Sequence, residues 1–137
     1  IPIQNITENN SSSEFEFGFD VSLSSNNYMA VGSNVNENTG KVDIYSGNKV
    51  IFTINNVILG FNNNIKLSDD GQTLIIPEIY TDESLIETQV FRLKLDENNK
   101  IKYEKVVSKS VGKSVDISND GNTLAIGYDD RVDIYLE

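Results

Sequence analysis

From residue 18 onward, apolar and polar residues alternate along most of the chain. A period of two is the pattern of a β-strand with one buried face, whereas an amphipathic helix repeats its apolar residues every three or four positions. Polar segments rich in Asn, Asp, Ser and Gly separate the alternating runs and are typical of turns. The sequence therefore predicts an all-β fold with no helix longer than a turn. The predicted strands are residues 18–24, 28–33, 40–46, 49–55, 64–68, 73–79, 86–96, 100–107, 112–118, 122–128 and 131–136.

The alternating runs belong to a unit that recurs three times. The segment SDDGQTL at residues 68–74 returns as SNDGNTL at 118–124, and a copy one residue shorter begins at Ser24. Further along the first and third copies, the tetrapeptide VDIY occurs at residues 42–45 and 132–135. Asp-Gly pairs between alternating runs predict tight hairpin turns. A repeat of about 45–50 residues with up to four short strands has the size of a β-propeller blade.

We therefore predict three four-stranded antiparallel propeller-like blades, at about residues 14–56, 57–108 and 109–137, the last without a fourth strand of its own. Residues 1–13 form an N-terminal segment in which a polar loop follows a short apolar stretch. Residues 1–7 are predicted to supply the missing strand of a third blade. Known propellers close with about four to eight blades. We therefore expect further blades, from a second copy of the chain in a homo-oligomer or from a longer protein.

Short motifs of the first repeat resemble those of a known family. The segments FGFDVSLS at 17–24, AVGS at 30–33 and GKVDIY at 40–45 resemble the FG-GAP repeats of integrin-alpha-type propellers. SNDGNTLA at 118–125 is similar to part of a WD40 blade, without the Gly-His and Trp-Asp pairs of that family. The resemblance implies a β-propeller. Calcium-binding repeats of the integrin type carry a longer acidic hairpin, and the short turns here offer too few oxygens for calcium, so no metal is predicted.

Composition and charge exclude several functional classes. The chain of 137 residues has no Cys, His or Trp, which excludes disulfides, thiolate zinc sites and catalysis by Ser-His or Cys-His pairs. Its net charge of −10 disfavours binding to nucleic acid or anionic lipid. No apolar run approaches the ~18 residues of a membrane span. Matches to the N-glycosylation signal near the N-terminus lean toward an extracellular or particle-surface location. No cofactor is predicted.

Neighbouring acidic residues at 69–70, 82–83 and 129–130 all lie in predicted turns, where side chains point to solvent. Acid–base or glycosidase chemistry needs carboxylates held together in a cleft. No catalytic residue is therefore predicted, and the protein is not expected to be an enzyme.

Two equivalent loops combine a tyrosine with charged residues, and they are the predicted binding face, although these tyrosines could instead pack between blades. The Asn-rich loop at residues 34–40 is also part of the predicted binding face. Its amides are neutral and its Gly is displaced from the calcium-loop position, so it is a poor metal site. The predicted binding residues are Tyr80, Asp82, Glu83, Tyr128, Asp129, Asp130, Arg131, Asn34, Asn36 and Asn38. We expect a non-catalytic module for protein recognition, adhesion or assembly. Two alternatives stay open: a carbohydrate-binding or glycan-hydrolysing propeller, and a structural component of a virion or surface layer.

Overall fold

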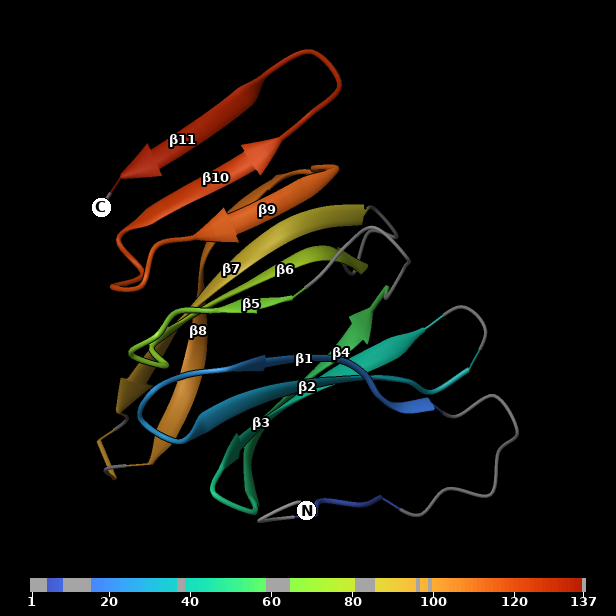
Figure 1. The fold of residues 1–137 in the computed structure, drawn as a ribbon, viewed down its shortest axis with the longest axis vertical. Coiled ribbons are helices and arrows are strands. Elements are labelled where there is room, and N and C mark those ends of the chain that lie inside the picture. The colour runs from blue at the N-terminus through green and yellow to red at the C-terminus, as the bar shows by residue number, and fades with distance from the viewer. Residues whose placement is uncertain are drawn as a thin grey trace.

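A computed structural model describes residues 5–8, 16–36, 39–58, 65–80, 86–95, 97–98 and 100–136. These residues form β-strands and turns, with no helix among them (Figure 1). The prediction of an all-β fold is therefore confirmed. The strands are β1 (Glu16–Leu23), β2 (Tyr28–Asn34), β3 (Gly40–Ser46), β4 (Lys49–Val57), β5 (Lys66–Leu67), β6 (Thr73–Tyr80), β7 (Ile86–Leu95), β8 (Ile101–Ser110), β9 (Ser114–Ile117), β10 (Thr123–Gly127) and β11 (Val132–Leu136).

All strand pairs are antiparallel and follow the chain in three meanders: the first is β1–β4, the second β5–β8 and the third β9–β11. The first two belong to one eight-stranded sheet, joined by the single residue pair Val57↔Ile79 between β4 and β6. The third meander is a separate three-stranded sheet. Figure 1 shows the three meanders one after another along the long axis of the molecule. The described strands close no ring, and the number of propeller blades stays a prediction.

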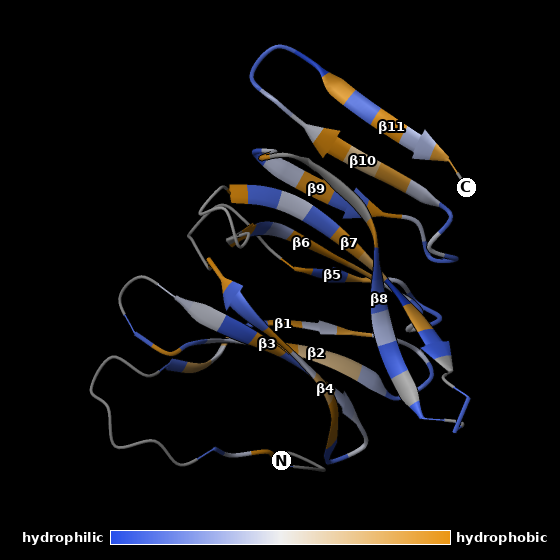
Figure 2. Ribbon diagram, turned by 180° about the vertical axis from the view of Figure 1, so that it is seen from behind, coloured by the Kyte–Doolittle hydropathy of each residue, from blue (hydrophilic) through white to orange (hydrophobic). Residues whose placement is uncertain are grey.

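The core lies in two layers, one on each side of the second meander. Ala30, Val42 and Ile44 of the first meander pack with residues of the second such as Leu74 and Ile76. On the opposite face, Ile75 and Val90 pack against Leu124 and Ile126 of β10. Successive side chains of a strand point to opposite faces. The consecutive apolar residues of β6 therefore serve two different cores, while β11, with one face toward the core, shows alternating bands of hydropathy in Figure 2.

The recurring Ser-x-Asp/Asn segment forms the same hydrogen-bonded turn in each meander. In the second, the Ser68 hydroxyl donates to Asp70 Oδ1 (2.6 Å) and accepts from the backbone N–H of Thr73 (3.0 Å). Ser118 makes the equivalent bonds with Asp120 and Thr123 at the same distances. In the first turn the Ser24 hydroxyl donates to Asn26 and accepts from the N–H of Tyr28. The motif therefore stabilises a turn, and its Asp70 and Asp120 carboxylates accept hydrogen bonds within that turn.

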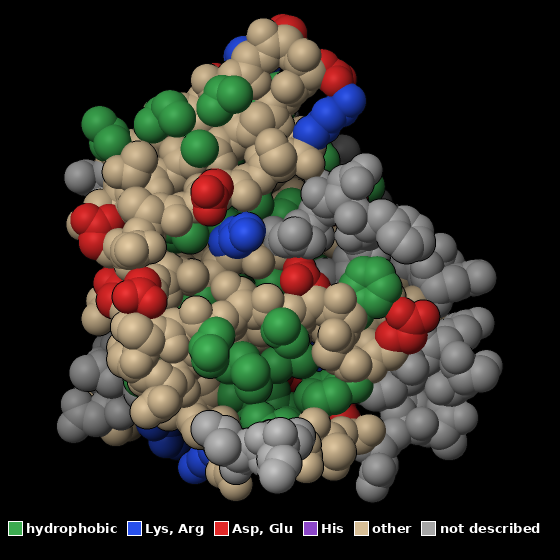
Figure 3. Space-filling model, in the orientation of Figure 1, with side chains coloured by type: hydrophobic (Ala, Val, Ile, Leu, Met, Phe, Trp, Pro, Cys, Tyr) green, Lys and Arg blue, Asp and Glu red, His purple; other side chains and the backbone are tan. Residues whose placement is uncertain are grey.

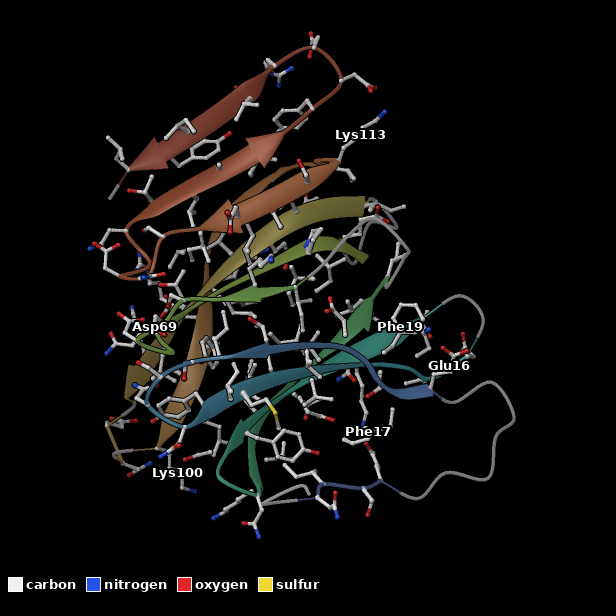
Figure 4. All side chains as sticks on the ribbon, viewed as in Figure 1. Glu16, Phe17, Phe19, Asp69, Lys100 and Lys113 are labelled. Atoms are coloured by element: carbon white, nitrogen blue, oxygen red, sulfur yellow. The ribbon has the colours of Figure 1, made fainter. Side chains whose placement is uncertain are left out.

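The three turns also bond to one another. The backbone N–H of Ser25 donates to the carbonyl of Asp69 (2.9 Å), and the N–H of Asp69 donates in the same way to the carbonyl of Asn119 (2.9 Å). Ser25, Asp69 and Asn119 hold the second position of their respective turns. Figure 4 labels Asp69 at the edge of the molecule where these turns lie. The three meanders are therefore fixed in register at this edge.

Residues 5–8 of the N-terminal segment form no strand. The Glu8 carboxylate accepts a hydrogen bond from Lys41 Nζ of β3 (2.6 Å), and Lys41 also pairs with Asp43 (3.2 Å). In Figure 1 this segment lies beside the first meander, at the far end of the molecule from β11. Residues 1–4 lie outside the described residues, and the closing strand at residues 1–7, like the proposed blade boundaries, stays a prediction.

Candidate functional site

A groove with a volume of about 750 Å³ lies beside the loop that joins β10 to β11. Glu78 of β6, residues 111–113 before β9 and the loop residues 128–131 line it. Figure 4 shows Lys113 at this edge of the third meander, extending toward solvent beside the β10–β11 loop. The groove contains four of the predicted binding residues, Tyr128, Asp129, Asp130 and Arg131, and it is the best-defined candidate site.

The loop is ordered around Arg131. The backbone N–H of Tyr128 donates to the carbonyl of Arg131 (2.8 Å), which closes the turn. The Arg131 guanidinium lies over the Tyr128 ring, 4.2 Å from its centroid, in cation–π geometry. It also pairs with Asp130 (3.3 Å) and Asp133 (3.2 Å). Such exposed contacts contribute little stability each, but together they hold the guanidinium over the ring.

The charges of the loop set the protonation of its neighbours. Asp133, and with it Asp130, raises the pKa of the Arg131 guanidinium, so Arg131 is a permanent cation. Burial, a hydrogen bond with Tyr128 and the nearby Asp133 raise the pKa of Tyr135 to about 12. Tyr135 is therefore a neutral phenol near neutral pH. The groove accordingly presents a fixed positive group, the Arg131 guanidinium, beside exposed carboxylates.

The acidic residues of the groove are exposed. Asp129 pairs with Lys113, and Asp130 with Arg131, and both carboxylates keep more than three quarters of their side-chain surface in contact with solvent. A general acid needs burial or a close second carboxylate to keep its proton near neutral pH. Asp129 and Asp130 are not buried. In the part of the chain that the structure describes, no three acidic side chains are placed to hold a metal ion.

The other predicted site residues are distributed differently. Tyr80 ends β6 with its backbone described, whereas Asp82, Glu83 and Asn38 lie outside the described residues. Asn36 Oδ1 accepts hydrogen bonds from the N–H (3.0 Å) and hydroxyl of Thr39, so this amide closes its own loop. Asn34 lies at the end of β2, and the loops after β2 and after β10 emerge on the same side of the molecule in Figure 1. Of the predicted binding residues that the structure describes, the groove brings together only those of the β10–β11 loop, residues 128–131.

A second, larger groove of about 940 Å³ was not predicted. It covers the face of β1 and β2 that points away from the second meander, and Phe17, Val21, Leu23 and Met29 line it together with Ile6. In Figure 3, apolar side chains gather over this region and, separately, along β10 and β11. Val21 and Leu23 are exposed, although the residues at the same places in the second repeat, Ile65 and Leu67, are buried. These positions are apolar in both repeats, so the sequence pattern alone does not show which pair is covered.

The sequence matches no protein-family model and no curated protein. Among the described residues, no helix is long and apolar enough to cross a membrane. The function is therefore argued from the geometry of the chain itself.

Proposed function

We propose that the protein is a non-catalytic recognition and assembly module in which three propeller-like blades, the last without its own fourth strand, present loops to a protein partner. The observation that carries this proposal is the groove beside the β10–β11 loop. It combines a Tyr–Arg stack with exposed carboxylates on a loop between two paired strands. Tyr and Arg are the residue types enriched at protein–protein interfaces, and loops on a rigid scaffold are their usual position.

The chemistry of the groove favours a basic partner. The carboxylates of Glu78, Asp129 and Asp130 surround it, and the whole chain carries a net charge of −10. The negative electrostatic potential of such a surface attracts cationic segments and increases their association rate. We therefore propose a Lys- and Arg-rich segment of a protein as the ligand class.

One observation favours protein over carbohydrate. Sugar binding commonly uses the open face of an aromatic ring, and the Arg131 guanidinium already covers one face of the Tyr128 ring. A peptide ligand can pair with the same carboxylates without displacing Arg131. Recognition of protein is therefore the better-supported function of this loop.

The test is an NMR titration with two peptides of equal length, one rich in Lys and Arg and one rich in Glu. We expect the basic peptide to shift the amide signals of residues 111–113 and 128–131, with binding that weakens as salt is added. The double variant Asp129→Asn/Asp130→Asn should bind several-fold more weakly. The control Glu97→Gln/Glu104→Gln removes two exposed carboxylates elsewhere and should bind as the parent does.

Equal affinity for both peptides, or signal shifts confined to other loops, would refute this assignment. A glycan array with an assay for sugar release examines the enzyme alternative. Release by the parent chain that is lost in Asp129→Asn would overturn the non-catalytic proposal.

A further inference from the structure

The same tetrapeptide has two different environments in this chain. Val42 and Ile44 of the first VDIY segment are completely buried between the first and second meanders. Val132 and Ile134 of the second VDIY segment keep 63% and 59% of their surface exposed. Both segments are third strands of a meander, β3 and β11, and both pair with the preceding strand in the same register: Ala30 faces Ile44, and Ala125 faces Ile134. The two tetrapeptides are thus identical, and they differ in whether another sheet packs on them.

The equivalent position in the second meander is also buried. Val90 of β7 faces Ile75 across the strands, in the place that Ile44 and Ile134 hold in the other meanders. Val90 is 1% exposed and packs with Leu124 and Ile126 of the third meander. The position is therefore buried wherever a following meander is present, and it is exposed only in the last one. We call this uncovered surface of the third meander, Ala125, Val132 and Ile134, the third outer face.

At the other end of the chain, the opposite surface is exposed along β1. Ile65 and Leu67 are buried against the first meander, and Val115 and Ile117 pack in the same way toward the second. The residues at the equivalent places in β1 are Val21 and Leu23. They are 59% and 71% exposed, and with Met29 they form the first outer face, within the larger of the two grooves described above.

We propose that a second copy of this chain places its first outer face on the third outer face, and so repeats head to tail the packing that each chain makes twice internally. The inference deepens the assembly part of the proposed function and rests on it. The two outer faces are the two halves of one kind of contact, which the chain already makes between its first and second and between its second and third meanders. A contact that joins two different surfaces closes into a ring or continues as a chain of copies.

The turn-to-turn hydrogen bonds support the same direction of growth. Each internal contact joins the N–H at the second position of one turn to the carbonyl at the second position of the next turn. Within the described part of the chain, the series ends with the N–H of Asn119 and the carbonyl of Ser25 unused. In the head-to-tail arrangement the N–H of Asn119 would face the carbonyl of Ser25 in the second copy.

The first turn also sets a limit on how close the copies approach. Asn27, with a φ of 69°, stands where Gly71 and Gly121 stand in the later turns. A Cβ at Gly71 would lie 2.6 Å from Tyr28 Cδ2 of the preceding meander, so the internal turns approach more closely than a side chain permits. The contact between copies is therefore wider at the turn, and the apolar strands β1 and β11 carry most of it.

Sedimentation velocity with single-face variants tests the proposal. The parent chain should show a mass above 15.3 kDa that rises with concentration. Val21→Glu/Leu23→Glu removes the first outer face, and Val132→Glu/Ile134→Glu removes the third; each variant alone should be monomeric. When mixed, the two should form a one-to-one complex that grows no further, because each retains the half that the other lacks. The control Val50→Glu/Val106→Glu changes two exposed valines of β4 and β8 and should associate as the parent does.

Two outcomes overturn the proposal. If the parent chain stays monomeric at every concentration, a second copy does not cover the two outer faces. Repeats of a longer chain would then be their occupant. Association of either single-face variant with itself indicates a different contact, such as like faces pairing. The substituted residues are already exposed, and far-ultraviolet circular dichroism verifies that each variant is folded. Titrating the monomeric Val21→Glu/Leu23→Glu variant with the basic peptide separates the two proposals, since its substitutions lie far from the groove beside the β10–β11 loop.

Discussion

Ser68 and Ser118 make the same hydrogen bonds in surroundings that differ in burial. Ser68 is 1% exposed because the third turn lies against it: a Cβ at Gly121 would lie 3.2 Å from its hydroxyl oxygen. Among the described residues, no further turn of this motif packs against Ser118, which is partly exposed. Removing a hydrogen-bond partner is costly where water cannot replace it. The two serines therefore form a matched pair for measuring the effect of burial on this motif.

Ser68→Ala should lower the free energy of unfolding by about 1–3 kcal/mol, because it leaves the N–H of Thr73 without its acceptor in a buried place. Ser118→Ala should lower it by about 1 kcal/mol or less, since water reaches its partners. Urea denaturation of both variants gives the comparison. An equal loss in the two would show that the third turn does not shield Ser68.

Asp20 connects the first and second meanders through a charged group. Its carboxylate accepts a hydrogen bond from the backbone N–H of Ile65 (2.7 Å). Burial raises the pKa of Asp20 above its ordinary value of 3.8, against the opposing effects of that hydrogen bond and of Lys66. The folded chain thus binds this proton more tightly than the unfolded chain does. The contribution of Asp20 to stability is therefore largest at low pH and decreases as pH rises from 3.8 through the raised value.

Asp20→Asn removes this dependence, while its amide oxygen still accepts from Ile65. We expect the free energy of unfolding of the variant, relative to the parent, to increase between about pH 3 and pH 7. Urea denaturation at the two pH values measures it, with Asp116→Asn, an exposed position on β9, as the matched control. A relative stability of Asp20→Asn that falls as pH rises would contradict the assigned direction of the pKa shift.

At the scale of elements, alternation and turn residues predicted every strand to within three residues at each end. Strand β5, predicted at residues 64–68 and observed as Lys66–Leu67, keeps the smallest share of its predicted length. The N–H groups of Ile65 and Leu67 donate to the side chains of Asp20 and Ser22 on β1. These bonds join the outer edge of β5 to another meander, and a strand period cannot reveal them. The candidate groove was predictable only in part, because the positions of Glu78 and Lys113 beside the 128–131 loop depend on tertiary packing.

The close approach of successive turns explains the glycine in the Ser-x-Asp-Gly motif. Gly71 has a φ of +73°, and an added Cβ would contact both Tyr28 and Asn26 of the first meander. Gly47 has a similar φ of +61°, but nothing lies within 4 Å of an added Cβ. The two glycines therefore share the backbone requirement and differ only in the neighbouring meander.

Gly47→Ala should cost about 1 kcal/mol of unfolding free energy, from the left-handed backbone alone. Gly71→Ala should cost a further 1–3 kcal/mol or so, because the first and second turns must move apart. Thermal and urea denaturation of both variants provide the measurement. If the two substitutions cost the same, the turns are not held in contact in solution.

At the scale of the whole molecule, the three meanders differ in how many of their faces are covered. The repeat in the sequence predicted that three similar units exist, but not which surfaces they bury. The second meander has cores on both sides, while the first and third each have one. Strand β11 is an edge strand whose outward side chains are mostly exposed. Stability should therefore be distributed unevenly, because local unfolding begins where the fewest apolar contacts are lost.

Hydrogen exchange monitored by mass spectrometry should show this distribution. We expect the slowest exchange in peptides from β6 and β7, and the fastest, among strand peptides, in β11. If copies dock head to tail, protection of β1 and β11 should increase with protein concentration, because both strands become covered. Strand β8 is also at the edge of its sheet but lies outside both outer faces, so its exchange should not depend on concentration. Equal protection of β11 and β6 in the dilute protein would mean that the third meander is held as firmly as the second, which burial on a single face does not allow.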